Sequence, residues 1–269
     1  CWGSNASGQL GLGDTSSRGD GSGEMGDSLP AVDLSSGRTA TAITTGDSHT
    51  CALLDNASVK CWGFNASGQL GLGNTNNRGD GANEMGDNLA AVDLGSGRTA
   101  TSIATGDSHT CALLDDNSVK CWGKADDGQL GTGKEFTLGD ASGEMGNTLL
   151  AIDLGTGRTA TAIAVGGEHS CAILDNSSIK CWGKNSSGQL GLGHNDTRGG
   201  DQVLLSTGAP LMGDNLPSVD LGTGRTARGI TAGDNQTCAI LDDASIKCWG
   251  SNTAGQLGLG HTNNRGDNS

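Results

Sequence analysis

Aromatic residues, prolines and long apolar runs are all scarce in this chain. Its 269 residues include no Tyr, two Phe and three Pro, and hydrophobic residues amount to 33%. Glycine, by contrast, is abundant, at 48 residues. Without internal periodicity, this composition would indicate low complexity or disorder. With periodicity, it indicates a repeat protein built with many tight turns.

Basic residues are scarce as well. The chain has 16 Lys and Arg against 30 Asp and Glu, a formal net charge of −14. Nucleic-acid binding requires Lys and Arg to neutralise phosphates, so an acidic chain without a basic stripe argues against that partner. An anionic membrane surface is disfavoured for the same reason. No apolar run is long enough to cross a membrane, so we expect no membrane span in this segment.

The chain does contain a repeating unit. The tripeptide Cys-Trp-Gly recurs at offsets of 60, 60, 60 and 67 residues. Each unit continues with a Gly-Gln-Leu-Gly turn, an acidic glycine-rich loop, an L-x-x-V/I-D-L segment, a Gly-Arg-Thr-Ala turn, an alternating run and a hairpin. We divide the chain into full units at 1–60, 61–120, 121–180 and 181–247, and a partial unit at 248–269.

Each unit is expected to form four strands. The first set comprises 39–45, which alternates small apolar residues with Thr, two hairpin arms at 49–54 and 58–62, and the segment 89–94. Four strands per unit, with glycine-rich turns and Trp-Gly at a strand end, predict an all-β fold of β-propeller blades. Helices are disfavoured because Gly and β-branched residues interrupt every window that could form one.

One segment identifies a family. Residues 109–133, HTCALLDDNSVKCWGKADDGQLGTG, resemble the repeat of the regulator of chromosome condensation family, whose signature is a Gly-x-x-His hairpin ending in Trp-Gly-x-Asn-x-x-Gly-Gln-Leu-Gly. All four full units carry the motif. The resemblance implies a β-propeller, commonly of seven blades. Members include nucleotide exchange factors, light sensors, secreted β-lactamase inhibitors and uncharacterised surface proteins, and similar cysteine-bearing units occur in secreted proteins.

The two ends of the chain supply incomplete blades. The N-terminal piece contributes only the last two strands of a blade, at 1–3 and 29–34, and the C-terminal unit contributes the first three. Joining the two pieces would duplicate the Cys-Trp-Gly strand. We therefore expect an excerpt of a longer propeller or array.

Eight of the nine cysteines form pairs ten residues apart across the hairpin. A three-residue loop centred on Asn56 would put Cys51 directly opposite Cys61, within reach of a disulfide. Zinc is the alternative, but this is not finger spacing and no His or Cys cluster accompanies it. Disulfides indicate an oxidising compartment, extracellular or at the cell surface. The predicted pairs are Cys51–Cys61, Cys111–Cys121, Cys171–Cys181 and Cys238–Cys248, with Cys1 left over.

Asn-x-Ser/Thr sequons recur at one repeat position, in the turn after Trp-Gly, where we expect a glycan to be exposed. A sequence rich in Ser, Thr and Asn also produces such motifs by chance. For a eukaryotic source, we predict glycosylation at Asn5, Asn65 and Asn185.

Three other side chains recur once per unit and have structural explanations. A His, replaced by Gln in the last unit, is expected to bond the backbone of a neighbouring loop, because one His per blade cannot converge on a metal or a reaction centre. The Trp is expected to fill the wedge between blades. The Lys two residues before it is expected to snorkel or to stack on the indole. The histidines are His49, His109 and His169.

The acidic loop is the best candidate for a ligand site. Carboxylates among glycines suit calcium, but the order of an EF-hand is missing. A solvated, internally hydrogen-bonded loop is the competing interpretation, and no other cofactor is expected. The candidate calcium ligands are Asp20, Glu24, Asp27, Asp80, Glu84 and Asp87.

The fourth unit replaces this loop with RGGDQVLLSTGAPLMGD, which is seven residues longer. Near-identical units favour a structural array, so divergence marks the place where a specific partner would bind. The candidate partner loop contains Asp201, Gln202, Val203, Leu204 and Leu205.

Together these patterns favour an extracellular, non-enzymatic scaffold or binding module that contacts a protein, a glycan or copies of itself. A secreted enzyme inhibitor is the alternative, but it would need a rim of exposed aromatic residues that this chain can hardly supply. A nucleotide exchange factor for a small GTPase is a further alternative, and the disulfides indicate the wrong compartment for it. No nucleophilic triad or phosphate-binding loop is recognisable.

Overall fold

The computed structural model describes residues 1–201 and 211–267. These residues form four antiparallel sheets of three strands each, and short 3₁₀ turns lie in the acidic loops. The sheets are β1 (Ala40–Thr45), β2 (His49–Leu54) and β3 (Val59–Gly63); β4 (Ala100–Thr105), β5 (His109–Leu114) and β6 (Val119–Gly123); β7 (Ala160–Val165), β8 (His169–Leu174) and β9 (Ile179–Gly183); and β10 (Ala227–Ala232), β11 (Gln236–Leu241) and β12 (Ile246–Gly250). The turns are η1 (Gly26–Ser28), η2 (Gly86–Asn88) and η3 (Gly213–Asn215). The predicted all-β fold of repeated blades is confirmed.

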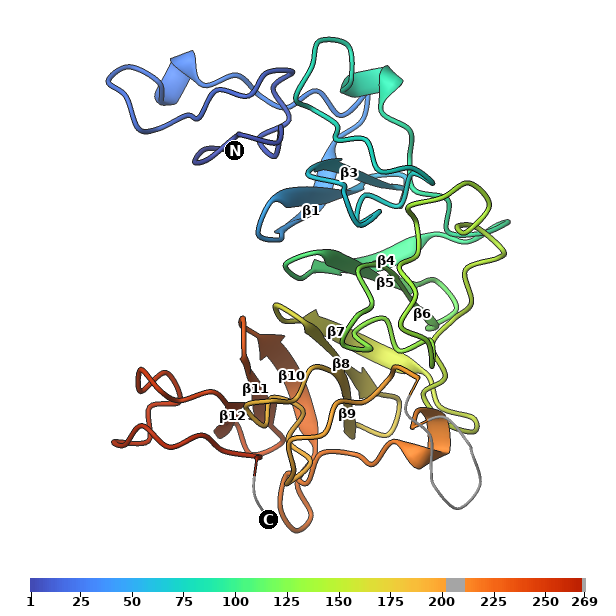
Figure 1. Cartoon of the computed structure of the whole chain (residues 1–269), viewed down its shortest axis with the longest axis vertical. Coiled ribbons are helices and arrows are strands. Elements are labelled where there is room, and N and C mark those ends of the chain that lie inside the picture. Colours follow the sequence, from blue (N-terminus) through green and yellow to red (C-terminus); the bar gives the residue numbers. More distant parts are fainter. Residues whose placement is uncertain (202–210, 268–269) are drawn as a thin grey trace.

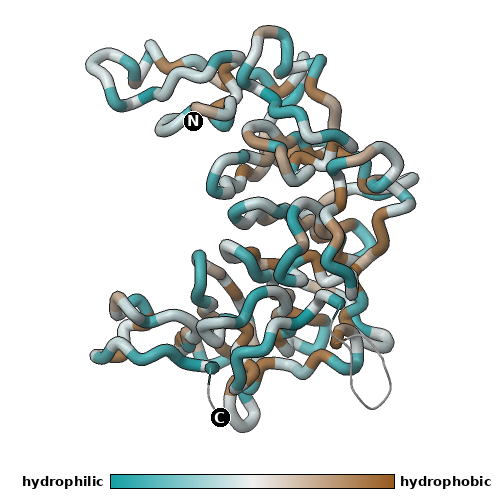
Figure 2. Tube along the Cα trace, viewed as in Figure 1, coloured by the Kyte–Doolittle hydropathy of each residue, from teal (hydrophilic) through white to brown (hydrophobic). Residues whose placement is uncertain are grey.

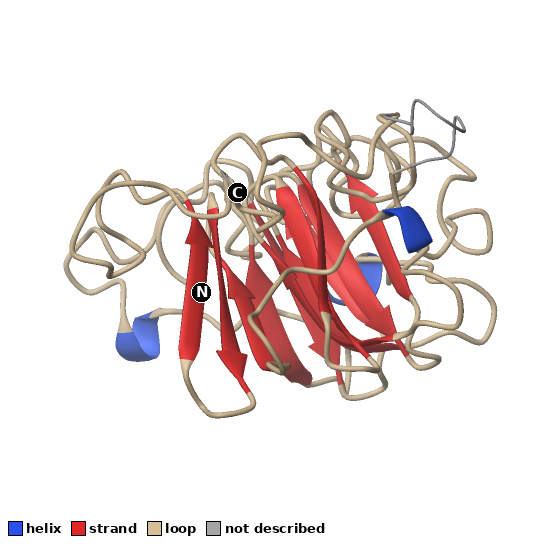
Figure 3. Ribbon diagram, turned by 90° about the horizontal axis from the view of Figure 1, so that it is seen from below, coloured by secondary structure: helices blue, strands red, loops and turns tan. Residues whose placement is uncertain are grey.

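The four sheets follow one another as an open arc (Figure 1). The first strand of each sheet contacts the first two strands of the sheet before it, so β4 packs on β1 and β2, and β10 packs on β7 and β8. Seen from below, the strands of successive sheets run side by side, with the loops gathered at their ends (Figure 3). The described part of the chain contains no helix with the length and hydrophobicity needed to cross a membrane.

The core lies between successive sheets. Hydrophobic residues concentrate there, whereas the long loops are mostly hydrophilic (Figure 2). In the first three sheets every residue of the hairpin strands is buried, as in β2 and β3. A chain with few aromatic residues therefore builds its core as a row of four apolar clusters, each packed between neighbouring repeats.

The hairpin register follows from its short loop. Leu54 N donates to Ser58 O at 2.9 Å, so a loop of three residues, Asp55 to Ala57, closes the hairpin. Ala57 takes the left-handed conformation, with a φ of 62°, that such a loop uses. Cys51 pairs directly with Cys61 across the strands. The predicted register is confirmed.

The predicted fourth strand is the part of the blade that the structure changes. Segment 89–94 runs beside β3, and Val92 N donates to Val59 O at 2.8 Å, but the segment forms no regular strand. Its next carbonyl, that of Asp93, instead accepts a hydrogen bond from Gly146 N of the following unit at 3.0 Å. After Val92 the backbone therefore leaves the sheet to bond with the next unit. A regular ladder of hydrogen bonds with β3 does not form.

Candidate functional site

A disulfide crosses the hairpin of every sheet. All four predicted pairs are confirmed, with Cα atoms 4.0–4.1 Å apart, and Cys1 is free. The cysteines of the first three pairs are at most 1% exposed. Cys238 and Cys248 are partly exposed, because no further sheet covers this face within the described residues. The first three disulfides therefore lie inside the core.

The recurring histidines connect successive sheets. His49 Nε2 lies 2.9 Å from the hydroxyl of Thr110 in the next sheet, and that hydroxyl donates to Gln69 O at 2.9 Å. Since the Thr proton is used on Gln69, His49 Nε2 must be the donor. The same carbonyl accepts a hydrogen bond from Trp122 Nε1 at 3.0 Å. The predicted partner, a loop backbone group, is wrong: a hydroxyl lies between the imidazole and that backbone.

The network repeats at each interface between sheets. His109 and His169 contact Ser170 and Thr237 at 3.0 and 2.8 Å. Burial lowers the pKa of His49 and His169 to about 4. Burial, together with the two neighbouring imidazoles, lowers the pKa of His109 to about 3. All three histidines are therefore neutral at physiological pH.

The recurring lysines of the first three sheets are buried rather than snorkelling, whereas Lys247 of the last sheet is exposed. Lys120 Nζ donates to Leu94 O at 2.9 Å and to Gly146 O at 2.8 Å, and so joins the loops of two successive units. Lys180 makes the equivalent bonds to Leu154 O and Gly213 O. Burial lowers the pKa of both ammonium groups. The sequence pattern placed each Lys beside a Trp but could not show which loop carbonyls surround it.

The sequon asparagines are enclosed, so the prediction that they would carry exposed glycans is wrong. Asn65 Nδ2 donates to Asn74 O and Asn76 O at 2.7 and 2.9 Å, and its Oδ1 accepts from Leu70 N at 3.0 Å. Its side chain ties the Gly-Gln-Leu-Gly turn to the loop that follows. Asn5, Asn65 and Asn185 are all 0% exposed.

The acidic loops use their carboxylates internally. Glu24 accepts hydrogen bonds from Gly19 N and Gly21 N at 2.8 and 2.9 Å, and these bonds lower its pKa. Asp87 accepts from Ser36 N and Ser36 Oγ of the preceding unit. Among the described residues, no group of three or more His, Cys, Asp and Glu side chains could hold a metal ion. Calcium binding at these loops stays a prediction.

The predicted partner loop lies almost wholly outside the described residues. Asp201 is described, and its carboxylate lies 3.9 Å from Lys134 Nζ of the third unit. Gln202, Val203, Leu204 and Leu205 are outside the described ranges.

Family models match the repeats that form these interfaces. The model of the regulator of chromosome condensation (RCC1) repeat matches residues 40–69, 100–129, 160–189 and 228–256, and a second model of the same repeat matches residues 1–53. Together these ranges cover more than half of the chain. The chain belongs to the RCC1 repeat family.

Similar proteins share parts of this RCC1 array. The human probable E3 ubiquitin-protein ligase HERC6 is 29% identical over 260 residues, which are 97% of this chain and 22% of that protein. The ultraviolet-B receptor UVR8 of Arabidopsis thaliana is 30% identical over 224 residues, 83% of this chain and 44% of that protein. The chain therefore spans less than half the length of either relative.

Solved structures show the same fold. Human WBSCR16 superposes with a TM-score of 0.68 at 19% identity, covering 98% of this chain and 60% of that chain. Yeast RCC1 (Prp20), solved bound to Kap60, gives a TM-score of 0.62 at 18% identity, covering 86% and 48%. At these identities the likeness establishes an RCC1 fold and no more.

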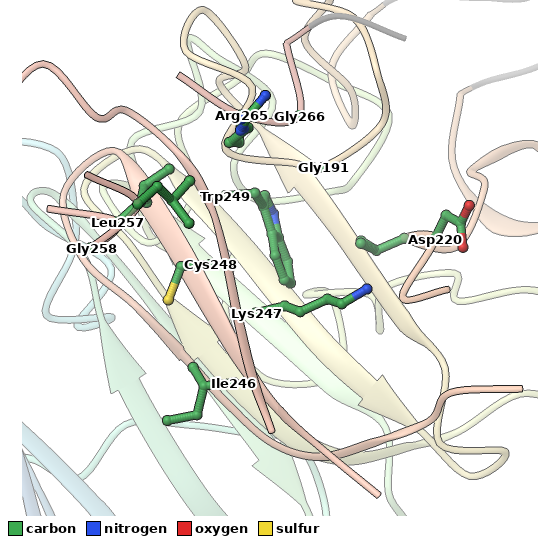
Figure 4. Close-up of a pocket in the computed structure, with 12 residues that line it drawn as sticks. Gly191, Asp220, Ile246, Lys247, Cys248, Trp249, Leu257, Gly258, Arg265 and Gly266 are labelled. Atoms are coloured by element: carbon green, nitrogen blue, oxygen red, sulfur yellow. The ribbon is translucent and has the colours of Figure 1, made fainter. Parts of the chain in front are cut away.

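A cavity of about 590 Å³ lies on the outer face of the last RCC1 blade. Ile246, Trp249 and Leu257 line it (Figure 4). Around the first three sheets, the L-x-x-V/I-D-L segment occupies the equivalent space, as the bond from Val219 N to Ile179 O shows. Ile246 is 67% exposed, whereas Ile179 at the same repeat position is 0% exposed. The cavity is thus an uncovered repeat interface.

The difference in burial between Ile179 and Ile246 gives a prediction with an internal control. Ile179→Ala should lower the free energy of unfolding by about 2–5 kcal/mol, because it leaves a cavity in the core. Ile246→Ala should change it by no more than about 0.5 kcal/mol, because the side chain is already in water. Denaturant unfolding of both variants measures the difference. Equal losses would show that the face around Ile246 is covered in solution.

One apolar cluster escaped the sequence analysis. Phe136 and Leu150 of the third unit are 67% and 73% exposed, although this unit lies inside the array. The other units carry Ser, Asn or Asp at the position of Phe136, and Pro or Ala at that of Leu150. Aligning the four units position by position would have revealed the cluster.

Proposed function

We propose that this chain is a non-enzymatic, extracellular or cell-surface scaffold of disulfide-stapled RCC1 blades that binds a protein partner. The observation that carries the proposal is the disulfide that crosses the hairpin of every described blade, buried in the first three. Disulfides form and persist in oxidising compartments and are rare in the cytosol and the nucleus. A staple repeated in each sheet therefore supports secretion of the whole array.

The non-enzymatic role is supported by how the recurring polar side chains are used. His109 bonds a neighbouring sheet, Lys120 bonds two loops, Asn65 closes a turn and Asp87 binds the preceding unit. Three of these groups join neighbouring repeats and Asn65 fixes a turn within its own repeat, so the recurrence of each has a structural explanation. A protein partner is supported by the structure of yeast RCC1, which shares the fold and was solved bound to Kap60.

The redox state of the native protein tests this proposal. Protein from its natural source is quenched in acid, alkylated and weighed before and after reduction. Peptide mass spectrometry then follows the eight paired cysteines, which we expect to be unmodified before reduction and alkylated after it. Alkylation of these eight cysteines before reduction would contradict an oxidising location.

A further inference from the structure

A groove of about 580 Å³ lies between the third and fourth units. It is lined by the turn from Gly131 to Leu138, by the segment around Leu149 and Leu150, and by the acidic loop of the fourth unit at Met212. Leu149 and Met212 are buried, at 1% and 5% exposure. Phe136 and Leu150 stand at the edge and are mostly exposed.

The same groove exists between the first and second units, which provides an internal comparison. There it measures about 380 Å³, with Pro30 at the position of Leu150 and Met85 at that of Met212. Ser16 occupies the position of Phe136, and Arg18 that of Leu138. The fold therefore builds a groove at both interfaces. The groove between the third and fourth units is the larger and the more apolar of the two.

The apolar residues are not needed to hold the units together. The equivalent interfaces are built with Ser, Asn or Asp in place of Phe136 and with Arg in place of Leu138. Exposed Phe and Leu side chains make the surface less soluble than the polar residues at the same positions of the other units do. A volume of about 580 Å³ lies within the range of about 300–1,000 Å³ that is typical of ligand-binding pockets. The departure from the repeat is therefore best explained by a bound ligand with an apolar group.

The charges at the edge select the kind of ligand. Glu144, Asp153 and Asp214 line the groove with a single Lys134, which lies 3.9 Å from Asp201. Lys180 is only 7% exposed, but its ammonium lies near Asp153 and Asp214 and offsets part of their charge. With Asp201, four carboxylates face two ammonium groups, so the edge stays net acidic and complements Lys or Arg.

We infer that this groove binds a polypeptide segment whose apolar side chain is flanked by Lys or Arg. The apolar side chain enters between Phe136, Leu150 and Met212, and the basic residues meet the carboxylates at the edge. A second copy of the chain fits poorly, because each copy carries a net charge of −14 and the copies would repel. The inference rests on the proposed function, for which it supplies the binding surface.

A peptide selection tests the inference. A phage-displayed library of random 12-residue peptides is selected on the full chain, with counter-selection on F136N/L138R/L150A. These substitutions restore residues that the second unit carries at Asn76, Arg78 and Ala90, so the fold already accommodates them. An unchanged melting temperature confirms that the variant is folded. I246S, which removes an exposed apolar residue outside the groove, is the matched control.

We expect selected peptides to share an apolar residue flanked by at least two Lys or Arg. Their affinity should fall about tenfold or more in the triple variant and stay unchanged in I246S. It should also weaken as salt is raised, because the carboxylates are exposed. Peptides without basic residues, equal binding to the triple variant, or no enrichment would overturn the inference.

A dimer that the triple variant abolishes would assign the groove to a second copy and would also overturn the inference. Sedimentation of the peptide-free chain over a range of concentrations would reveal it. Failure of the groove is distinguishable from failure of the proposed function, because the alkylation count reports the compartment without reference to Phe136 or Leu150.

Discussion

Reduction of the four disulfides at neutral pH is expected to unfold most of the molecule. Each closes a loop between cysteines ten residues apart and should contribute about 2–3 kcal/mol by restricting the unfolded chain. Four such contributions approach the whole stability of an ordinary domain, which is about 5–15 kcal/mol. The effect is large because the array buries few aromatic side chains, so the disulfides supply much of its stability.

The order of reduction should follow burial. The pair Cys238–Cys248 is partly exposed, whereas Cys51, Cys111 and Cys171 are at most 1% exposed with their partners. A water-soluble reductant should therefore reduce the last pair first, because reduction of the buried pairs requires local unfolding. Timed alkylation and peptide mass spectrometry follow each pair, in a Cys1→Ser background that lacks the free thiol. Equal rates at all four pairs, or an unchanged melting temperature after complete reduction, would contradict this expectation.

Lowering the pH from 7 to 5 should destabilise the protein steeply. The pKa values of His49 and His169 in the folded protein are about 4, and that of His109 is about 3, against 6.5 when unfolded. Between the folded pKa values and pH 6.5, these histidines are therefore protonated in the unfolded chain and neutral in the folded protein. The stabilisation is complete above pH 6.5 and is lost as the pH falls toward the folded pKa values. Each histidine should contribute about 1.4 kcal/mol per pH unit below 6.5.

Three histidines together should give a slope of about 4 kcal/mol per pH unit. The range between pH 6.5 and 5 isolates this effect, because most carboxylates titrate below it. Urea unfolding at several pH values measures the slope. The control variant, H49Q/H109Q/H169Q, keeps a side-chain donor at each position and removes the titration. Its stability should vary much less over the same range, with a remaining slope from His194, whose pKa is also lowered by burial and by Arg198. An equal slope in both proteins would refute the assignment.

The sequence alone predicted the features that depend on near neighbours. The pairing of Cys51 with Cys61 was predictable because a three-residue loop sets the register of a hairpin, and the partners lie ten residues apart. The strands expected at 39–45, 49–54 and 58–62 followed from alternation and from the turns between them, and the observed strands span 40–45, 49–54 and 59–63. The family followed from a motif that each full unit carries.

Only the tertiary structure decided what lies between units. Asn65 looked exposed because it sits in a polar turn, but the loop that encloses it folds back from Asn74 and Asn76. Lys120 bonds carbonyls 26 residues away on either side. Segment 89–94 leaves its sheet because Asp93 binds the next unit. These contacts join positions that no local pattern relates.

The stapled hairpin was therefore determined by the sequence, whereas the surface available to a partner was not. A hairpin closes over a few residues, so its geometry is encoded locally. Phe136 and Leu150 form one cluster only because the loop at 131–138 and the segment at 148–153 pack against each other, beside Met212 of the next unit. Stacking of repeats brought them together, and stacking is decided by the buried faces of whole sheets.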